Sequence, residues 1–282
     1  MDPISRIVNA PVGLARRRRG RTLERAVAGK VVLVTGASSG IGEATARRVA
    51  QAGATVGLVA RRAEPLEHLR DEIRAAGGRA EVYPADLSDL GAVDHLATQV
   101  LADHGRVDIL VNNAGLSIRR SIHLSYERFH DFERTMQLNY FGAVRLILAV
   151  LPGMRAQRSG HIVNISSVGV QAGAPRFAGY VASKAALDAF SDAVQAEVQA
   201  DGVRFTTVYM PLVRTPMIEP TPIYKRMPSL SSRQASKLVG AAITYRPRRL
   251  GTVAGSAAAF GASVAPWTTD TVRGIAYQLL PE

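Results

Sequence analysis

Short apolar runs alternate with longer stretches of helical periodicity along most of the chain, from Lys30 onward. The short runs predict strands, because they are rich in β-branched residues and several are continuously apolar, as in strands buried on both faces. The strands are expected at 31–35, 55–60, 81–84, 109–112, 161–165 and 204–209. Helices are expected at 40–52, about 65–76, after 88, over much of 126–154 and at about 178–200. The sequence therefore predicts an α/β fold, one domain over residues 30–250 built on a doubly wound parallel sheet with helices on both faces.

The pattern changes after residue 209, where five prolines fall within eighteen residues and exclude a long helix. We expect a loop that covers the substrate, a lid, within residues 215–240. Residues 251–282 form a C-terminal extension that begins with a segment rich in glycine, alanine and serine. This composition predicts either a tightly packed helix or a weakly ordered tail. Residues 1–29 form a separate N-terminal arm.

The 282 residues include no cysteine and carry a formal net charge of +12. The absence of thiols excludes a disulfide framework, a thiolate-bound metal and a reaction that carries its substrate on a cysteine thioester. No metal site is predicted. The positive charge suits phosphate groups, acidic lipids or nucleic acid as partners, or serves solubility alone. Of these partners, we do not expect nucleic acid.

Seven arginines lie within residues 1–29 against two acidic residues, so the N-terminal arm carries a charge of +5. The arm lacks the features of a signal peptide, and the chain has no stretch of about 20 apolar residues. We therefore expect a cytoplasmic protein. The arm predicts a solvated tail or, through Ile4, Ile7 and Val8 beside the arginines, a peripheral contact with anionic lipid at the inner membrane surface.

A glycine-rich segment, residues 35–42, joins the first predicted strand directly to the first predicted helix. Glycines in this position let the backbone turn tightly and approach a pyrophosphate, which then lies at the positive end of the helix. A glycine triplet alone is weak evidence, but the strand–turn–helix context favours the dinucleotide site of a Rossmann fold. The residues expected to contact the cofactor here are Gly36, Ser38, Ser39, Gly40, Ile41 and Gly42.

The second predicted strand ends at Ala60 and is followed by Arg61 and Arg62. An NAD site has an acidic residue at this point, which binds the ribose 2′-hydroxyl. A carboxylate repels a 2′-phosphate, whereas guanidinium groups bind it through charge-assisted hydrogen bonds. The sequence therefore predicts NADP(H) as the cofactor, the alternative being that both arginines are only solvated.

Four polar residues are candidates for catalysis. Tyr180 and Lys184 are four residues apart on a predicted helix, so they share one face of it. Ser167 precedes Tyr180 by thirteen residues at the end of a predicted strand, where open α/β sheets bind their ligands. Asn139 adds a polar group to an apolar segment, although a buried asparagine also commonly holds backbone segments together.

Taken together, these residues resemble the short-chain dehydrogenase/reductase family. The resemblance implies that Tyr180 is the general acid and that Ser167 orients the substrate oxygen. It implies that Lys184 binds the nicotinamide ribose and lowers the pKa of the tyrosine, and that Asn139 supports a proton-relay water. The further residues that match the family's cofactor contacts are Asp86, Leu87, Asn113, Ala114, Gly115, Pro211, Val213 and Thr215.

Segments 117–120, 129–143 and 209–218 are similar to the bacterial long-chain fatty acyl-CoA reductases, which convert acyl-CoA to fatty aldehyde with NADPH. This resemblance implies a lipid-like substrate, most specifically a long-chain acyl-CoA. The missing cysteine is consistent with direct hydride attack on the thioester. One alternative is a carbonyl reductase acting on ketones, 3-oxoacyl groups or hydroxysteroids. A second alternative is a non-enzymatic NADP-binding sensor or scaffold, against which the intact catalytic set argues.

Two features depart from the family pattern. Leu212 follows Pro211 where the family usually has glycine, and the C-terminus lacks the family's usual strand ending in a glycine pair. Because that strand helps to build the family's tetramer, we expect a homo-oligomer that is a dimer rather than a tetramer. Basic clusters are candidates for binding the phosphates of coenzyme A. They are Arg119, Arg120, Lys225, Arg226, Arg246, Arg248 and Arg249.

Overall fold

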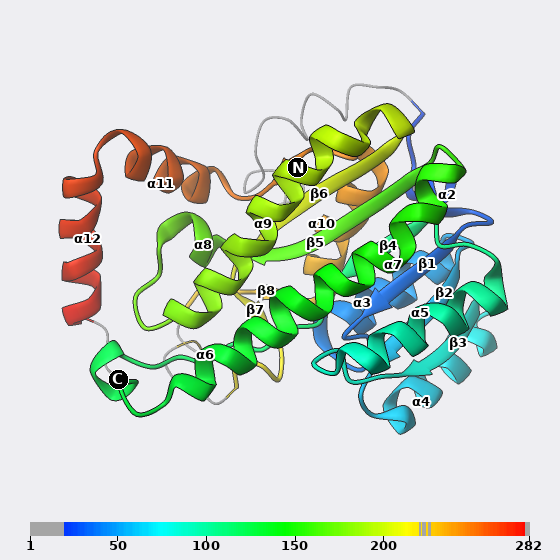
Figure 1. Ribbon diagram of the computed structural model, residues 1–282, viewed down its shortest axis with the longest axis horizontal. Coiled ribbons are helices and arrows are strands. Elements are labelled where there is room, and N and C mark those ends of the chain that lie inside the picture. Colours follow the sequence, from blue (N-terminus) through cyan, green and yellow to red (C-terminus); the bar gives the residue numbers. More distant parts are fainter. Residues whose placement is uncertain (1–19, 220, 222–223, 225–226, 280–282) are drawn as a thin grey trace.

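The computed structural model describes residues 20–219, 221, 224 and 227–279, and a parallel β-sheet lies at its centre (Figure 1). Within these residues seven strands pair in the order β3-β2-β1-β4-β5-β6-β9, and every neighbouring pair is parallel. The chain order reverses between β1 and β4, as in other doubly wound sheets. The strands are β1 (Val31–Thr35), β2 (Thr55–Ala60), β3 (Arg79–Pro84), β4 (Ile109–Asn112), β5 (Gly160–Ser167), β6 (Val203–Met210) and β9 (Arg249–Leu250).

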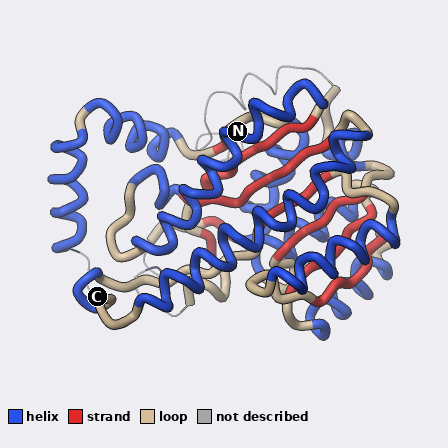
Figure 2. Tube along the Cα trace, in the orientation of Figure 1, coloured by secondary structure: helices blue, strands red, loops and turns tan. Residues whose placement is uncertain are grey.

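Helices cover both faces of this sheet, as the tube in Figure 2 shows. Those on one face are α3 (Gly40–Gln51), α4 (Ala63–Ala75) and α10 (Ser232–Tyr245). Those on the other face are α5 (Leu90–His104), α7 (Ala143–Ala156) and α9 (Ala178–Val198). The predicted fold class is therefore confirmed. The central strands β1 and β4 are buried along their whole length, which explains their continuous apolar sequence.

The helix expected over 126–154 is interrupted. It consists of α6 (Phe129–Met136), a π-helix η3 (Gln137–Gly142) and then α7. A π-helical turn is rare and often lies at a functional site, and Asn139 is part of this one. A further short helix, α8 (Val168–Ala172), follows β5 directly and was not expected.

The predicted lid is more ordered than expected. β7 (Val213–Arg214) and β8 (Leu230–Ser231) pair in parallel and bring the two ends of the loop together. α10 then begins within the predicted lid, at Ser232, because Ser231 and Gln234 form a capping box. The loop itself therefore covers only 215–229, and Lys225 and Arg226 lie outside the described residues.

The C-terminus contains the strand that its sequence did not suggest. β9 pairs with β6 through Thr207 with Arg249 and Val208 with Leu250, so the expectation of a missing strand is wrong. Two residues are too few to show an alternating pattern, and no glycine pair follows them. Beyond β9 the extension forms α11 (Val253–Val264) and α12 (Pro266–Leu279), which are helical but mostly exposed. None of the helices in the described part of the chain is both long and apolar enough to cross a membrane.

The end of the N-terminal arm belongs to the folded domain. Thr22 caps a short helix, α2 (Leu23–Val27), by accepting a hydrogen bond from the Arg25 N–H at 3.3 Å. Val27 is fully buried in the core beside α3 and α10. Residues 1–19, which include the arginine run and the candidate lipid anchor, lie outside the described residues.

Candidate active site

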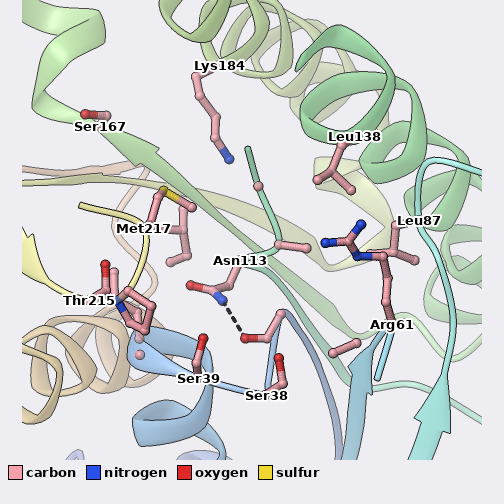
Figure 3. Close-up of a pocket in the computed structure, with 18 of the residues that line it drawn as sticks. Ser38, Ser39, Arg61, Leu87, Asn113, Leu138, Ser167, Lys184, Thr215 and Met217 are labelled. Atoms are coloured by element: carbon pink, nitrogen blue, oxygen red, sulfur yellow. Dashed lines mark hydrogen bonds between the residues drawn. The ribbon is translucent and has the colours of Figure 1, made fainter. Parts of the chain in front are cut away.

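A cavity of about 360 Å³, hereafter the main cavity, lies at the carboxyl ends of the central strands (Figure 3). Open α/β sheets bind their ligands at this edge, where the chain order reverses. The structure brings together fifteen of the residues expected at the site. They are Gly36, Ser38, Ser39, Gly40, Ile41, Arg61, Arg62, Leu87, Asn113, Ala114, Gly115, Ser167, Tyr180, Lys184 and Thr215.

The glycine turn between β1 and α3 depends on three glycines. Gly36 and Gly40 adopt positive φ angles of 65° and 60°, which other residues rarely adopt. A Cβ atom on Gly42 would lie 2.1 Å from the carbonyl oxygen of Gly36, so α3 can approach the turn only without a side chain there. The Ser39 side chain makes no capping hydrogen bond at the start of α3. This cradle fits a pyrophosphate at a helix N-terminus.

The Thr35 side chain joins the two halves of the sheet at the floor of the main cavity. Its hydroxyl accepts hydrogen bonds from the Asn113 and Ala114 N–H groups at 2.9 and 3.0 Å, and donates one to the Val111 carbonyl at 3.3 Å. The Asn113 amide donates to the Thr35 and Gly36 carbonyls at 2.9 and 3.3 Å. These bonds fix the segment after β4 against the glycine turn.

The charged side chains among the described residues that line the main cavity are Arg61, Arg62 and Lys184, and all three are cationic. Arg61 and Arg62 follow directly after β2. Asp86 does not line the cavity: its carboxylate accepts hydrogen bonds from the Ser88 N–H and hydroxyl at 2.9 and 2.7 Å. Burial acts to raise the pKa of Asp86, but these bonds and the Arg61 charge lower it below its ordinary value. The cavity therefore suits an anionic ligand.

Tyr180, Ser167 and Lys184 meet at the main cavity. Tyr180 and Ser167 share a hydrogen bond, and the Ser167 Oγ also accepts one from the Gly169 N–H at 3.0 Å. Figure 3 shows the Lys184 ammonium directed into the cavity. Burial raises the pKa of Tyr180, and only the bond with Ser167 opposes this shift. The direction is opposite to the lowering by Lys184 that the family resemblance implied.

Asn139 does not line the main cavity, because its side chain is fully used in holding the backbone. It accepts a hydrogen bond from the Leu116 N–H at 2.7 Å and donates to the Leu116 carbonyl and the Ser183 hydroxyl, both at 2.9 Å. It thus joins the segment after β4 to α9, next to Lys184. The role in a proton-relay water stays a prediction.

Asp188 was missed by the sequence analysis. It lies one helical turn after Lys184, does not line the main cavity, and accepts a hydrogen bond from the buried Ser166 hydroxyl at 3.4 Å. Burial raises the pKa of Asp188 to about 6, against the hydrogen bond from Tyr209 and the charge of Lys184. Burial likewise lowers the pKa of Lys184 to about 8, against the charge of Asp188. The available signal was an acidic residue four positions after the lysine on an apolar helix face.

The remaining expected residues lie near the main cavity without lining it. Pro211 and Val213 lead into the loop whose Thr215, Pro216 and Met217 do line it. Leu138 and Ser166 line the main cavity although neither was expected to act at the site, whereas Met217 belongs to the predicted lid.

One of the basic clusters proposed for coenzyme A, Arg246 with Arg248 and Arg249, lies outside the main cavity. Arg248 and Arg249 both form ion pairs with Asp192, the second at 2.7 Å. Arg246 caps the C-terminus of α10, where it is half-buried. The structure therefore does not bring these three arginines into the main cavity.

Comparisons with known proteins point to one family. A family model described as short chain dehydrogenase matches residues 30–223. The chain is 55% identical over 290 residues to an uncharacterized oxidoreductase of Mycobacterium tuberculosis, covering 98% of this chain and 85% of that protein. It is 54% identical over 255 residues to a fatty acyl-CoA reductase of Acinetobacter baylyi, covering 90% of this chain and 86% of that protein.

Solved structures agree with this result. The crystal structure of a metagenomic short-chain oxidoreductase in complex with NADP superimposes with a TM-score of 0.68 and 34% sequence identity. The match covers 78% of this chain and 92% of the other.

Proposed function

The chain belongs to the short-chain dehydrogenase family, and from that premise we propose that it reduces long-chain fatty acyl-CoA to fatty aldehyde with NADPH. Members of this family are oxidoreductases that bind a nicotinamide cofactor. The observation that carries the substrate proposal is the 54% identity, over 90% of the chain, to a protein named fatty acyl-CoA reductase. One of the segments similar to that class of enzyme, residues 117–120, lies beside Tyr180, because Ile118 and Arg120 line one small cavity with it.

The choice of NADPH is supported by the charges at the main cavity. Arg61 and Arg62 follow β2, where an NAD site has a carboxylate, and the described lining residues include no acidic side chain. Guanidinium groups bind a 2′-phosphate through paired charge-assisted hydrogen bonds. The glycine turn would hold the pyrophosphate at the start of α3, and Lys184 would hold the nicotinamide ribose.

In this proposal, NADPH supplies a hydride to the thioester carbonyl carbon when it is bound. The Ser167 and Tyr180 hydroxyls donate hydrogen bonds to the oxygen as negative charge develops on it, and Tyr180 transfers its proton. The product of this step is a hemithioacetal. Its hydroxyl then loses a proton, the C=O bond forms again as the C–S bond breaks, and the released thiolate of coenzyme A takes up a proton.

The raised pKa of Tyr180 is compatible with this role. A proton donor must be protonated before the reaction, and burial keeps the Tyr180 hydroxyl in that form. The positive charge of Lys184 beside the cavity favours the phenolate that remains after the transfer. Asp188 helps to keep Lys184 charged, because its carboxylate opposes the lowering of the lysine pKa by burial.

The test is to incubate the protein with NADPH and palmitoyl-CoA and to measure NADPH oxidation, aldehyde and free thiol together. Equal amounts of aldehyde and thiol are expected, with none from the Tyr180→Phe variant above a small residual rate. A parallel assay supplies a ketone, a 3-oxoacyl thioester and a hydroxysteroid. Turnover of one of these without any aldehyde from palmitoyl-CoA would replace the proposal by an ordinary carbonyl reductase.

A further inference from the structure

The C-terminal helix α12 directs its apolar side toward solvent. Val272, Ile275 and Leu279 are exposed and recur at intervals of three and four residues, so they share one face. On the other face, the Arg273 Nε donates a hydrogen bond to the Ala172 carbonyl at 2.8 Å, and Tyr277 also contacts the domain. An ordinary surface helix has the reverse orientation, with its apolar stripe toward the core.

The Tyr277 side chain fixes this orientation from a second point. Its ring lies under the Arg176 guanidinium, 4.3 Å from the ring centroid, and its hydroxyl donates to the Ser121 Oγ at 3.4 Å. Arg176 lies in the segment that leads to α9, and Ser121 lies in the segment that leads to α6. The outward apolar stripe is therefore held in place by the polar contacts behind it.

Helix α11 contacts α12 and also exposes apolar side chains. It contains no charged residue over its 12 positions, and its exposed residues Val253, Ala257, Phe260 and Val264 also share one face. The single tryptophan of the chain, Trp267, lies in the first turn of α12 and is 87% exposed. Large apolar side chains that are grouped and exposed are unusual on a surface that contacts only water.

The loop at residues 122–129 lies beside α12 at the same end of the molecule (Figure 1). It adds the exposed side chains of Ile122, Leu124, Tyr126 and Phe129. We call residues 122–129 together with 253–279 the C-terminal apolar face. Most of the exposed large apolar side chains of the described chain lie on it. Apolar surface gathered in this way marks a binding face.

We propose that the C-terminal apolar face docks on the surface of an anionic lipid bilayer. The net charge of +12 attracts anionic headgroups, and the exposed apolar side chains suit the hydrocarbon beneath them. In the segment 117–128, next to the exposed loop, Arg120 and Arg128 form ion pairs with Asp131 at 3.4 and 2.8 Å, so the attraction comes from the net charge of the chain and not from this segment. Helices of 12 and 14 residues are too short to cross a bilayer but can lie along its interface, where tryptophan is favoured.

This face adjoins the candidate active site. Ile122 of the exposed loop and Tyr180 line one small cavity, together with Phe132. A protein docked through the C-terminal apolar face therefore presents the region of Tyr180 to the bilayer. Docking is a binding property that needs no substrate, so its test is independent of the proposed reaction.

The experiment measures flotation of the full chain with vesicles of phosphatidylglycerol and phosphatidylcholine, against vesicles of phosphatidylcholine alone. We expect binding to the anionic vesicles that weakens with added salt, since salt screens the headgroup charge. Trp267 emission shifts to shorter wavelength on binding and is quenched by lipids with brominated acyl chains. Because this is the only tryptophan, the signal reports directly on α12.

Two variants with the same charge change locate the binding face. Ile275→Asp lies on the face, and Leu148→Asp on α7 lies away from it, at similar exposures of 52% and 49%. We expect vesicle affinity to fall about ten-fold or more for Ile275→Asp and less than two-fold for Leu148→Asp, on the usual scale for burying one aliphatic side chain. Circular dichroism and thermal unfolding verify that both variants are folded.

Three outcomes would overturn the proposal. The first is no binding to anionic vesicles at any salt concentration. The second is equal loss of binding in both variants, which would place the contact elsewhere. The third is a shift of Trp267 emission without vesicles that grows with protein concentration, accompanied by a doubled mass that Ile275→Asp abolishes; this result would make the face an interface between two copies.

Discussion

A Cβ atom on Gly42 would lie 2.1 Å from the carbonyl oxygen of Gly36. The obstacle is backbone, which cannot rotate away as a side chain can. Gly42→Ala is therefore expected to lower the free energy of unfolding by roughly 1–3 kcal/mol or more, as other overpacked sites do. It is also expected to weaken cofactor binding, because the glycine turn has to move. Urea unfolding and titration with NADPH measure the two effects.

Gly153 provides the matched control for this change. It also lies in a helix, α7, but a Cβ atom there would meet no atom within 4 Å. Gly153→Ala is expected to be neutral or to stabilise the fold by about 0.5–1 kcal/mol, since alanine favours the helix. If the two variants unfold at the same urea concentration, close packing at Gly42 is unimportant.

Tyr180→Phe retains the ring and removes the proton that the proposed mechanism transfers. We expect kcat to fall by roughly two orders of magnitude or more, the usual scale for general acid catalysis. Binding of NADPH, followed by its fluorescence, is expected to change little. Turnover close to that of the wild type would remove Tyr180 from the role of proton donor.

Arg61→Asp replaces a cation with an anion at the end of β2. We expect KM for NADPH to rise by roughly ten-fold or more, since a charge-assisted contact is lost and repulsion is added, whereas KM for NADH changes little. Arg155→Asp, on the exposed end of α7, has the same charge change outside the main cavity and serves as the control. Equal use of both cofactors by the wild type would contradict the assignment of NADPH.

The pH profile depends on Lys184. Because burial lowers its pKa to about 8, the side chain is charged below that pH and becomes neutral above it. If the charge holds the cofactor, kcat/KM for NADPH is expected to fall as the pH rises through about 8. The Lys184→Met variant is expected to be slow and to lack this decline.

Asp188→Asn tests the role of the Lys184 charge in the pH profile without replacing the lysine itself. The Asp188 carboxylate acts to raise the pKa of Lys184, so its removal lowers that pKa further. The decline in kcat/KM is therefore expected to begin at lower pH in the variant. An unchanged profile would mean that another group is responsible for the decline.

The loop at 215–229 predicts a dependence on acyl chain length. Met217, which lines the main cavity, and Met227 offer flexible apolar surface to a hydrocarbon chain. Each buried methylene contributes about 0.8 kcal/mol, so kcat/KM is expected to rise several-fold per pair of carbons until the pocket is full. The measurement is a series of acyl-CoA substrates of increasing length. A flat profile would show that the loop does not bind the chain.

The sheet and the glycine turn could be predicted because their physical requirements are local. A strand covered on both faces must be apolar throughout, as β1 is, and a turn at positive φ requires glycine, as at Gly36. Residues at the ends of parallel strands then share one edge of the sheet. This is why Ser167, Tyr180 and Lys184 could be placed near the cofactor loop from their order along the chain.

The features that were missed depend on tertiary contacts. β9 has only two residues and is recognisable as a strand only beside β6. The π-helix at Asn139 is stabilised by bonds to Leu116 and Ser183, which are remote in sequence. The direction of the Tyr180 pKa follows from burial, which depends on the packing of the whole site. The outward apolar face of α12 was hidden because periodicity shows that a face exists but not where it points.

The hydroxyl of Thr35 also has a consequence for the order of folding. It bonds to Asn113 and Ala114, residues 78 and 79 positions later, across the point where the two halves of the sheet meet. Contacts of such high sequence separation form late, because the chain between them must first be closed into a loop. The floor of the nucleotide site is therefore completed only after both halves have assembled. Acquisition of NADPH binding by a refolding chain should mark the end of folding, and a nascent chain that has emerged only to β3 should bind none.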